Sequence, residues 1–292
     1  MRISFIRTTL AFLVFCLIFM KVSAQPKPEK CILVFGAHAD DVEPMAGGTF
    51  AKYIAEGYRG IYVCVINNFA GCGIESVGGG TTPPPEATRP LFTVSSSTLD
   101  YPVDALETMQ IRSEEAINAA AVFKAEPVFL DFHEGFVWFG RSRANIGSYE
   151  YWQYSPPGRQ AVSLAEEEDG NIDYLVELLR KYKPEIVITH TLGGDKHDHG
   201  NSAYIMYLAF KRAAEKGVPV GKLWMKPKGW LIDDTGKPGK RGKPDVKIDV
   251  KDYVAVKYEA LNKHVSQKGT IRKQTLPSEN VEQFITVIDN TK

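Results

Sequence analysis

The stretch "CILVFGAHADDVEPMAGGTF", residues 31–50, decides the fold because it joins an apolar run to a polar cluster and then to a helical pattern. The apolar run does not alternate with polar residues, which is typical of a strand covered on both faces of a parallel sheet. Residues 60–66 follow as a second apolar run. The stretch therefore predicts a strand, a helix and a second strand, with His38, Asp40 and Asp41 where the first strand ends.

The same alternation of helices and strands continues along the chain. Further helices are predicted over 104–124, 172–184, 201–217 and 251–269, and further strands over 127–132, 185–190, 222–225 and 229–232. This order predicts a doubly wound α/β fold, a mostly parallel sheet with helices on both faces in three layers. No internal repeat or linker divides the sequence. We therefore expect residues 25–292 to form a single domain.

The composition limits the classes of partner. The 292 residues are 44% apolar and 24% charged, and the formal net charge is zero. Nucleic acids and anionic membranes are bound through an excess of Lys and Arg, so neither is an expected partner. The basic, turn-rich segment 236–244 is expected to be a solvated loop. A small or weakly charged substrate fits the composition better.

The first 24 residues have the pattern of a secretory signal peptide. Arg2 and Arg7 flank the start of an uncharged apolar core, and Ala24 ends a small-residue cleavage site. The alternative is a retained membrane anchor, but the apolar run is shorter than the roughly 20 residues that span a bilayer. We expect an exported protein, periplasmic or secreted, with no membrane anchor after cleavage.

The cysteines do not define a metal site. Cys31, Cys64 and Cys72 remain after signal removal, so at most one internal disulfide is possible, and the sequence has no CxxC pair. The first two lie in strand-like apolar runs, where a cysteine usually behaves as a small buried hydrophobe. Which of the three pair is not indicated by the sequence.

Polar side chains follow three of the predicted strands. Five of the six histidines lie in the segments "HADD" (38–41), "DFHEG" (131–135) and "THTLGGDKHDH" (189–199). Ligands of doubly wound sheets bind outside the carboxyl ends of the strands, where these segments are expected to meet. For Asp131 and His133, a role in closing the strand is the favoured alternative to a place in the site.

The residue types in the first and third segments suit a metal-dependent hydrolase. His38 and Asp41 can point into one site if the chain turns between them, and a third ligand such as His199 would complete a catalytic zinc set. Asp40 is then available to take a proton from water, and Asp198 to orient an imidazole. The alternatives are that the aspartates cap the following helix and that residues 196–199 form a solvated polar turn.

Four motifs in order resemble the PIG-L/LmbE-like zinc-dependent N-deacetylases. The stretch "GAHADDVEPMAGGT" is similar to their AHPDDxE…G signature, and "HDH" at 197–199 stands where HPDH is expected. Residues 111–123, "IRSEEAINAAAVF", resemble the R-x-x-E-A helix of the family. Residues 257–267, "KYEALNKHVSQ", resemble its C-terminal helix. Together the motifs span nearly the whole mature chain.

The resemblance implies a Rossmann-like sheet and assigns roles to individual residues. Zinc is expected on His38, Asp41 and His199, with Asp40 as general base and Arg112 near the site, in contact with substrate or with the oxyanion of the reaction. Two positions depart from the family: Ala39 replaces a proline, and Lys196 replaces the first histidine of HPDH.

The histidine that Lys196 replaces steadies the tetrahedral intermediate or protonates the leaving amine. We assign that role to His197, with Lys196 as an alternative positive group that contacts substrate. His264 lies in the last motif, and we expect it to be structural.

The predicted function is removal of the N-acetyl group from an amino sugar or glycoconjugate by an exported zinc hydrolase. Segments 67–104 and 133–170 are expected to shape the pocket, and the aromatic residues of the second could stack on sugar rings. Two alternatives remain: a non-catalytic carbohydrate-binding protein of the same fold, and a metal-dependent amidase or esterase of a non-sugar substrate. The sequence indicates neither the particular sugar nor the oligomeric state.

Overall fold

The computed structural model describes residues 30–68, 105–133, 162, 165, 168–192, 198–227, 242–267 and 280–291. Several sequence predictions lie outside these ranges. They are the signal peptide, most of segments 67–104 and 133–170, the strand at 229–232, most of the basic loop 236–244, Cys72, Lys196 and His197. None of the helices in the described ranges is long and apolar enough to cross a lipid bilayer.

The centre of the fold is a seven-stranded mixed sheet in the order β3-β2-β1-β4-β5-β7-β6. The first five strands of this order are parallel, and β7 is antiparallel to both of its neighbours. The strands are β1 (Cys31–Gly36), β2 (Arg59–Ile66), β3 (Glu126–Phe132), β4 (Ile186–Thr189), β5 (Lys222–Met225), β6 (Val246–Asp249) and β7 (Val281–Asp289). This confirms the predicted mostly parallel α/β sheet.

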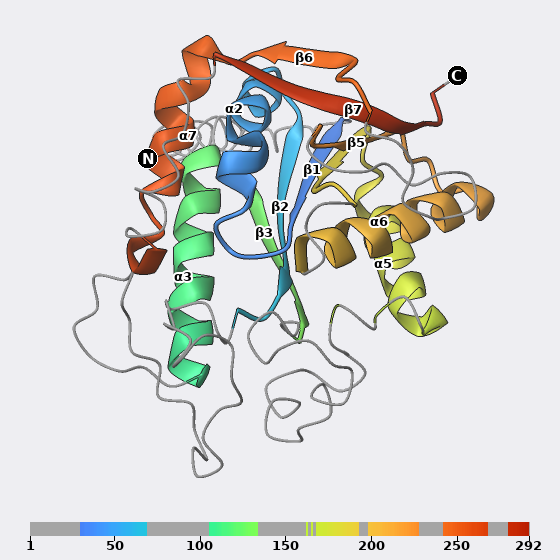
Figure 1. Ribbon diagram of the computed structural model, residues 1–292, viewed down its shortest axis with the longest axis horizontal. Coiled ribbons are helices and arrows are strands. Elements are labelled where there is room, and N and C mark those ends of the chain that lie inside the picture. The colour runs from blue at the N-terminus through green and yellow to red at the C-terminus, as the bar shows by residue number, and fades with distance from the viewer. Residues whose placement is uncertain are drawn as a thin grey trace, which may run out of the picture.

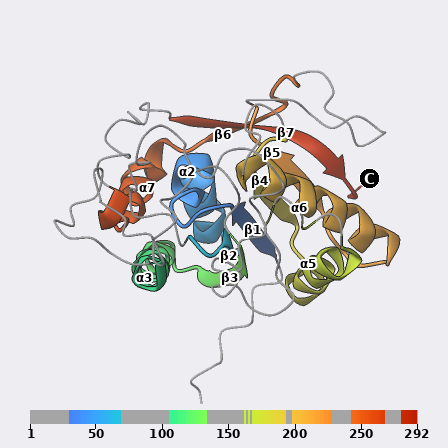
Figure 2. The same cartoon turned by 60° about the horizontal axis from the view of Figure 1, so that its bottom comes forward.

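Helices cover both faces of the sheet, as Figure 2 shows. The helices are α2 (Val42–Ala55), α3 (Ala105–Phe123), α5 (Asp169–Tyr182), α6 (Asp198–Glu215) and α7 (Val254–Leu261), with short 3₁₀ turns η3 (Lys251–Tyr253) and η4 (Val265–Gln267). Alternate residues of β1 enter two cores: Leu33 and Phe35 pack with α5 and α6, whereas Ile32 and Val34 pack with α2 and α3. The predicted three layers are therefore present.

The C-terminal part of the chain differs from the sequence prediction. The expected helix over 251–269 is divided into η3, α7 and η4, and strands β6 and β7 were not predicted. β7 crosses the end of the sheet in Figure 1 and pairs with both β5 and β6. At its start, buried and exposed residues alternate, the pattern of a strand with one covered face.

The strand order fixes where a site can form. β1 lies between β2 and β4, so the connections from β1 and from β4 leave in opposite directions along the sheet. This reversal opens a crevice outside the carboxyl ends of β1 and β4, the usual ligand site of doubly wound sheets. The segments after β1 and β4 are those in which the histidines cluster.

Candidate metal centre

The loop after β1 turns sharply and brings Asp41 back towards His38. Gly36 permits this turn, because a Cβ atom there would lie 3.0 Å from the Cβ of Asp41. Asp41 occupies the N-cap position of α2, yet its side chain makes no capping hydrogen bond. Its Oδ2 instead accepts the backbone N–H of His38 at 2.5 Å. Helix capping therefore does not account for the Asp41 side chain.

Tyr62 of β2 and Asn68, which follows β2, hold the backbone of Ala39 in the loop between His38 and Asp41. The side-chain oxygen of Asn68 accepts the N–H of Ala39 at 3.0 Å, and the hydroxyl of Tyr62 donates to its carbonyl at 2.5 Å. Proline, the residue of the family motif at this position, has no N–H to donate. In this chain the hydrogen bonds with Asn68 and Tyr62 hold the loop in place of a proline.

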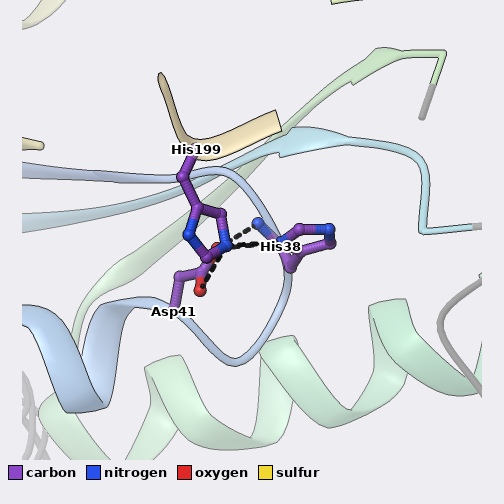
Figure 3. A group of neighbouring side chains, drawn as sticks. All are labelled: His38, Asp41 and His199. Carbon is purple, nitrogen blue, oxygen red and sulfur yellow. Dashed lines mark hydrogen bonds and ion pairs between the residues drawn. The ribbon is translucent and has the colours of Figure 1, made fainter. Parts of the chain in front are cut away.

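His38, Asp41 and His199 come together at the end of the sheet, as Figure 3 shows. His38 Nδ1 lies 3.2 Å from Asp41 Oδ2 and 3.1 Å from His199 Nε2. His199 Nε2 lies 3.3 Å from Asp41 Oδ1. His199 is in the first turn of α6, so the two halves of the trio come from segments more than 150 residues apart.

The trio fits a zinc ion by its donor atoms and by their spacing. Two imidazole nitrogens and a carboxylate are a common catalytic zinc set, with the fourth position left for water. Ligands placed tetrahedrally at 2.0–2.1 Å from zinc are about 3.3 Å apart. The two imidazole nitrogens are 3.1 Å apart, and each has one oxygen of Asp41 at a similar distance.

Asp198 supports the trio from the opposite side of the His38 ring. Its Oδ2 lies 3.5 Å from His38 Nε2, the nitrogen that faces away from the trio, and the side chain is almost fully buried. A carboxylate behind a ligating histidine fixes its tautomer and makes the ligating nitrogen more basic. α6 begins at Asp198 rather than at 201, so this residue lies in a helical turn and not in a loop.

His190 is a fourth residue at the centre that the predicted site did not include. It follows β4, its ring stacks on that of His199 at 4.2 Å and 9°, and its Nε2 lies 3.3 Å from Asp41 Oδ2. The backbone N–H of Ala37 donates to the same nitrogen at 3.1 Å. His190 therefore acts as a buried support for the trio. The sequence could have indicated His190 as a site residue, because it directly follows the apolar strand β4.

The net effect of burial and the neighbouring side chains lowers the pKa of both Asp41 and His190. Burial raises the pKa of Asp41, but His199 and His190 outweigh it and hold the pKa well below its usual value. Burial, together with His199 and His38, lowers the pKa of His190 more than Asp41 raises it, so its imidazole is favoured in the neutral form. Asp41 is therefore ionised, the state in which a carboxylate binds a metal ion.

One carboxylate oxygen of Asp40 contacts α3. Its Oδ1 accepts a hydrogen bond from Nη2 of Arg112, which is 1% exposed, while the Asp40 side chain is 20% exposed. Burial raises the pKa of Asp40, but Arg112 together with His264 and His38 lowers it by more, so that the net shift is downward. Asp40 is therefore ionised at neutral pH and accessible to a small molecule.

The structure places the remaining predicted residues outside the trio. His264 is fully buried, with Nε2 3.4 Å from Glu43 Oε1. His133 is also buried, at the end of β3, and Asp131 beside it has a left-handed φ of 53°. Cys31 and Cys64 are free and buried.

The sheet and the trio define an α/β protein with a candidate mononuclear metal centre at the switch point of its strands. The family model for PIG-L, GlcNAc-PI de-N-acetylase, matches residues 33–210, which include all the site residues described above. The chain belongs to the PIG-L family. Membership places it among hydrolytic deacetylases, in agreement with the resemblance of its motifs.

Solved structures of other proteins share the fold at low identity. The 4-carboxy-2-hydroxymuconate hydratase of Pseudomonas putida is 18% identical, with a TM-score of 0.54, over 90% of this chain and 98% of the other. The N,N'-diacetylchitobiose deacetylase of Pyrococcus horikoshii is 17% identical, with a TM-score of 0.52, over 95% and 92%. A deacetylase of teicoplanin biosynthesis is 18% identical, with a TM-score of 0.52, over 85% and 88%.

Proposed function

We propose that the protein is an exported zinc-dependent hydrolase that removes the N-acetyl group from an amino sugar or from a glycoconjugate that carries one. The observation that carries the proposal is the trio of His38, Asp41 and His199, with the ionised carboxylate of Asp40 next to it in the chain. Membership of the PIG-L family supports deacetylation as the reaction. Export rests on the sequence of residues 1–24 alone.

His38, Asp41 and His199 would hold the zinc ion, which polarises the amide carbonyl and lowers the pKa of a water molecule when bound. Asp40 accepts the proton that the attacking water loses as its oxygen bonds to the carbonyl carbon. The C–N bond then breaks, the amine leaves with a proton, and acetate is the second product. Asp198 keeps the His38 ring oriented throughout, because its carboxylate faces Nε2.

The group that donates the proton to the amine is assigned from the sequence. His197 and Lys196 directly precede Asp198 in the sequence, and on that ground we propose that one of them acts at the trio. A cation there would stabilise the developing oxyanion, and a protonated imidazole would also donate to the nitrogen. Arg112 is still proposed to contact the substrate or the oxyanion. Its guanidinium is buried and pairs with Asp40.

An N-acetylated sugar is proposed as the substrate on two grounds. The family description names a GlcNAc conjugate, and two structural neighbours at TM-scores of 0.52 are described as deacetylases of N,N'-diacetylchitobiose and of the teicoplanin pathway. Export would direct the enzyme to glycans outside the cytoplasm or to their fragments. A hydratase also has this fold, so the reaction must be tested directly.

The test is acetate release from a panel of N-acetylated sugars and chito-oligosaccharides by the zinc-loaded protein. We expect release by the native protein, loss after chelation, and a 10²- to 10⁴-fold lower kcat in Asp40→Asn, about the usual effect of removing a general base. Esters and non-sugar amides in the same panel separate the sugar deacetylase from a broader amidase or esterase. Sugar binding without hydrolysis by the metal-loaded protein would refute the proposal and favour a carbohydrate-binding protein.

Metal content tests the ligand set independently of activity. His199→Ala is expected to contain less than one tenth of the zinc of the native protein after dialysis, because two ligands rarely retain a catalytic ion. His264→Ala serves as a comparison, since that imidazole is buried outside the trio. Full zinc occupancy in His199→Ala would show that the assigned ligands are wrong.

A further inference from the structure

A buried chain of hydrogen bonds lies behind Asp40 and does not include the metal trio. Arg112 of α3 donates from Nη2 to Asp40 and from Nη1 to Glu115 Oε2 at 3.3 Å. Glu115 is in turn held by Ser266 of η4, whose backbone N–H donates to Oε1 at 2.6 Å and whose hydroxyl donates to Oε2 at 2.8 Å. Two distant segments of the chain, α3 and η4, thus meet behind the carboxylate of Asp40.

Burial makes this arrangement rigid. Arg112 and Ser266 are each 1% exposed, and Glu115 is 7% exposed. The guanidinium is planar and presents its donors in a fixed fork, so that carboxylates on both terminal nitrogens determine the direction of its plane. Turning the guanidinium away from Glu115 would leave that carboxylate buried without its cation, which is unfavourable.

We propose that Glu115 is a positioning residue for Asp40 and that it acts through Arg112. Held by Ser266, Glu115 fixes the guanidinium, and the guanidinium fixes the carboxylate of Asp40 through Oδ1. Because Oδ1 is held, the second oxygen, Oδ2, keeps one fixed direction and can accept the proton from water in the proposed reaction. A general base must lie within about 2.6–3.2 Å of the proton it accepts, so its orientation limits the rate. The inference rests on the proposed function, in which Asp40 is that base.

Glu115→Gln separates the two contacts of this residue. The amide oxygen can still accept the N–H of Ser266, and the serine hydroxyl can reverse its hydrogen bond to the amide nitrogen. The same nitrogen, however, would face the donors of Arg112, so the contact that orients the guanidinium is lost, together with the longer one of 4.0 Å to His264 Nδ1. Glu114→Gln is the matched control, because Glu114 precedes it on the same helix, is exposed and pairs with Gln110.

We expect Glu115→Gln to lower kcat by about 10- to 100-fold with KM and zinc content unchanged, since misplacing a reacting group has effects of this size. Glu114→Gln should match the native protein in all three. Ser266→Ala, which keeps the backbone N–H, should lower kcat by about threefold and provides the comparison if Glu115→Gln does not fold. A crystal structure of either variant should show Asp40 turned away from its native direction.

A double-mutant cycle with Asp40→Asn distinguishes positioning from general destabilisation. If Glu115 acts through Asp40, adding Glu115→Gln to Asp40→Asn changes kcat by less than about twofold. The proposal would be overturned if Glu115→Gln lowered kcat by the same factor in the native protein and in Asp40→Asn. It would also be overturned if Glu115→Gln had the native kcat. A native protein that releases no acetate would refute the proposed function instead. The crystal structures would then decide separately whether Glu115 fixes Asp40.

Discussion

The ion pair between Lys257 of α7 and Glu282 of β7 gives a quantitative prediction about stability. Both residues are buried, and Lys257 Nζ lies 2.6 Å from Glu282 Oε1. α2 is kinked at Ala46, whose φ is −153°, so the helix restarts with unsatisfied backbone N–H groups. Glu282 accepts two of these, from Gly48 at 3.0 Å and Thr49 at 2.7 Å.

Glu282→Ala removes all three of these interactions at once. It leaves the ammonium of Lys257 buried without a partner, and breaking a buried pair in this way costs about 3–5 kcal/mol. Each unsatisfied backbone N–H adds about 1–3 kcal/mol unless water replaces the carboxylate. We therefore expect the free energy of unfolding to fall by at least about 4 kcal/mol, a large share of the roughly 5–15 kcal/mol typical of a domain.

Urea unfolding at pH 7, followed by circular dichroism, measures this difference. Gln283→Ala is the control, because the next residue of β7 is exposed and its substitution should change stability by less than about 0.5 kcal/mol. Lys257→Met combined with Glu282→Gln removes both charges and keeps an acceptor, so it should be more stable than Glu282→Ala. A loss below about 1 kcal/mol in Glu282→Ala would refute the reasoning.

Three further predictions follow from single contacts. Burial lowers the pKa of His264, but its glutamate partner raises it more, and the folded pKa lies above 6.5. Its contribution to stability is thus complete below the unfolded pKa and is lost as the pH rises through the folded pKa. In His264→Gln the free energy of unfolding should therefore depend less on pH above pH 6.5. An unchanged pH dependence would contradict the raised pKa of His264. Gly221→Ala should destabilise by about 1–3 kcal/mol in urea, because its Cβ would lie 2.2 Å from a backbone oxygen, whereas Gly170→Ala has open space and should not. Asn68→Ala should release the N–H of Ala39, lower stability by about 1–2 kcal/mol and weaken zinc retention after dialysis; native retention would show that this bond does not hold the loop.

The first half of the fold could be predicted from the sequence because its signals are local. β1 and β2 are continuous apolar runs, and α3 differs from its predicted bounds by one residue at each end. β7 was missed because its nine residues pair across the sheet with a strand about 60 positions earlier, a contact that no local pattern indicates. The same applies to the division of the last helix, where Ser266 leaves the helix to bind Glu115.

The site was predicted in outline, with Asp198 beside a histidine, and its other supports were not. His38, Asp41 and His199 were identified by residue type and by resemblance, and the structure brings them together. The contacts of Arg112 with Asp40 and of His190 with Asp41 depend on how α3 and β4 pack, which spacing in the sequence does not specify. Lys196 and His197 remain predictions.

The distance in sequence between His38 and His199 has a consequence for how the protein matures. The two imidazoles are 161 residues apart and meet only when β4 has paired with β1, so an unfolded chain has no preformed site for the ion. An ion that binds the folded chain alone stabilises it by about 2.7 kcal/mol at one hundred times its Kd. Under the proposed function, metal supply in the compartment where the chain folds would therefore raise the share of the protein that survives proteolysis, independently of any effect on catalysis.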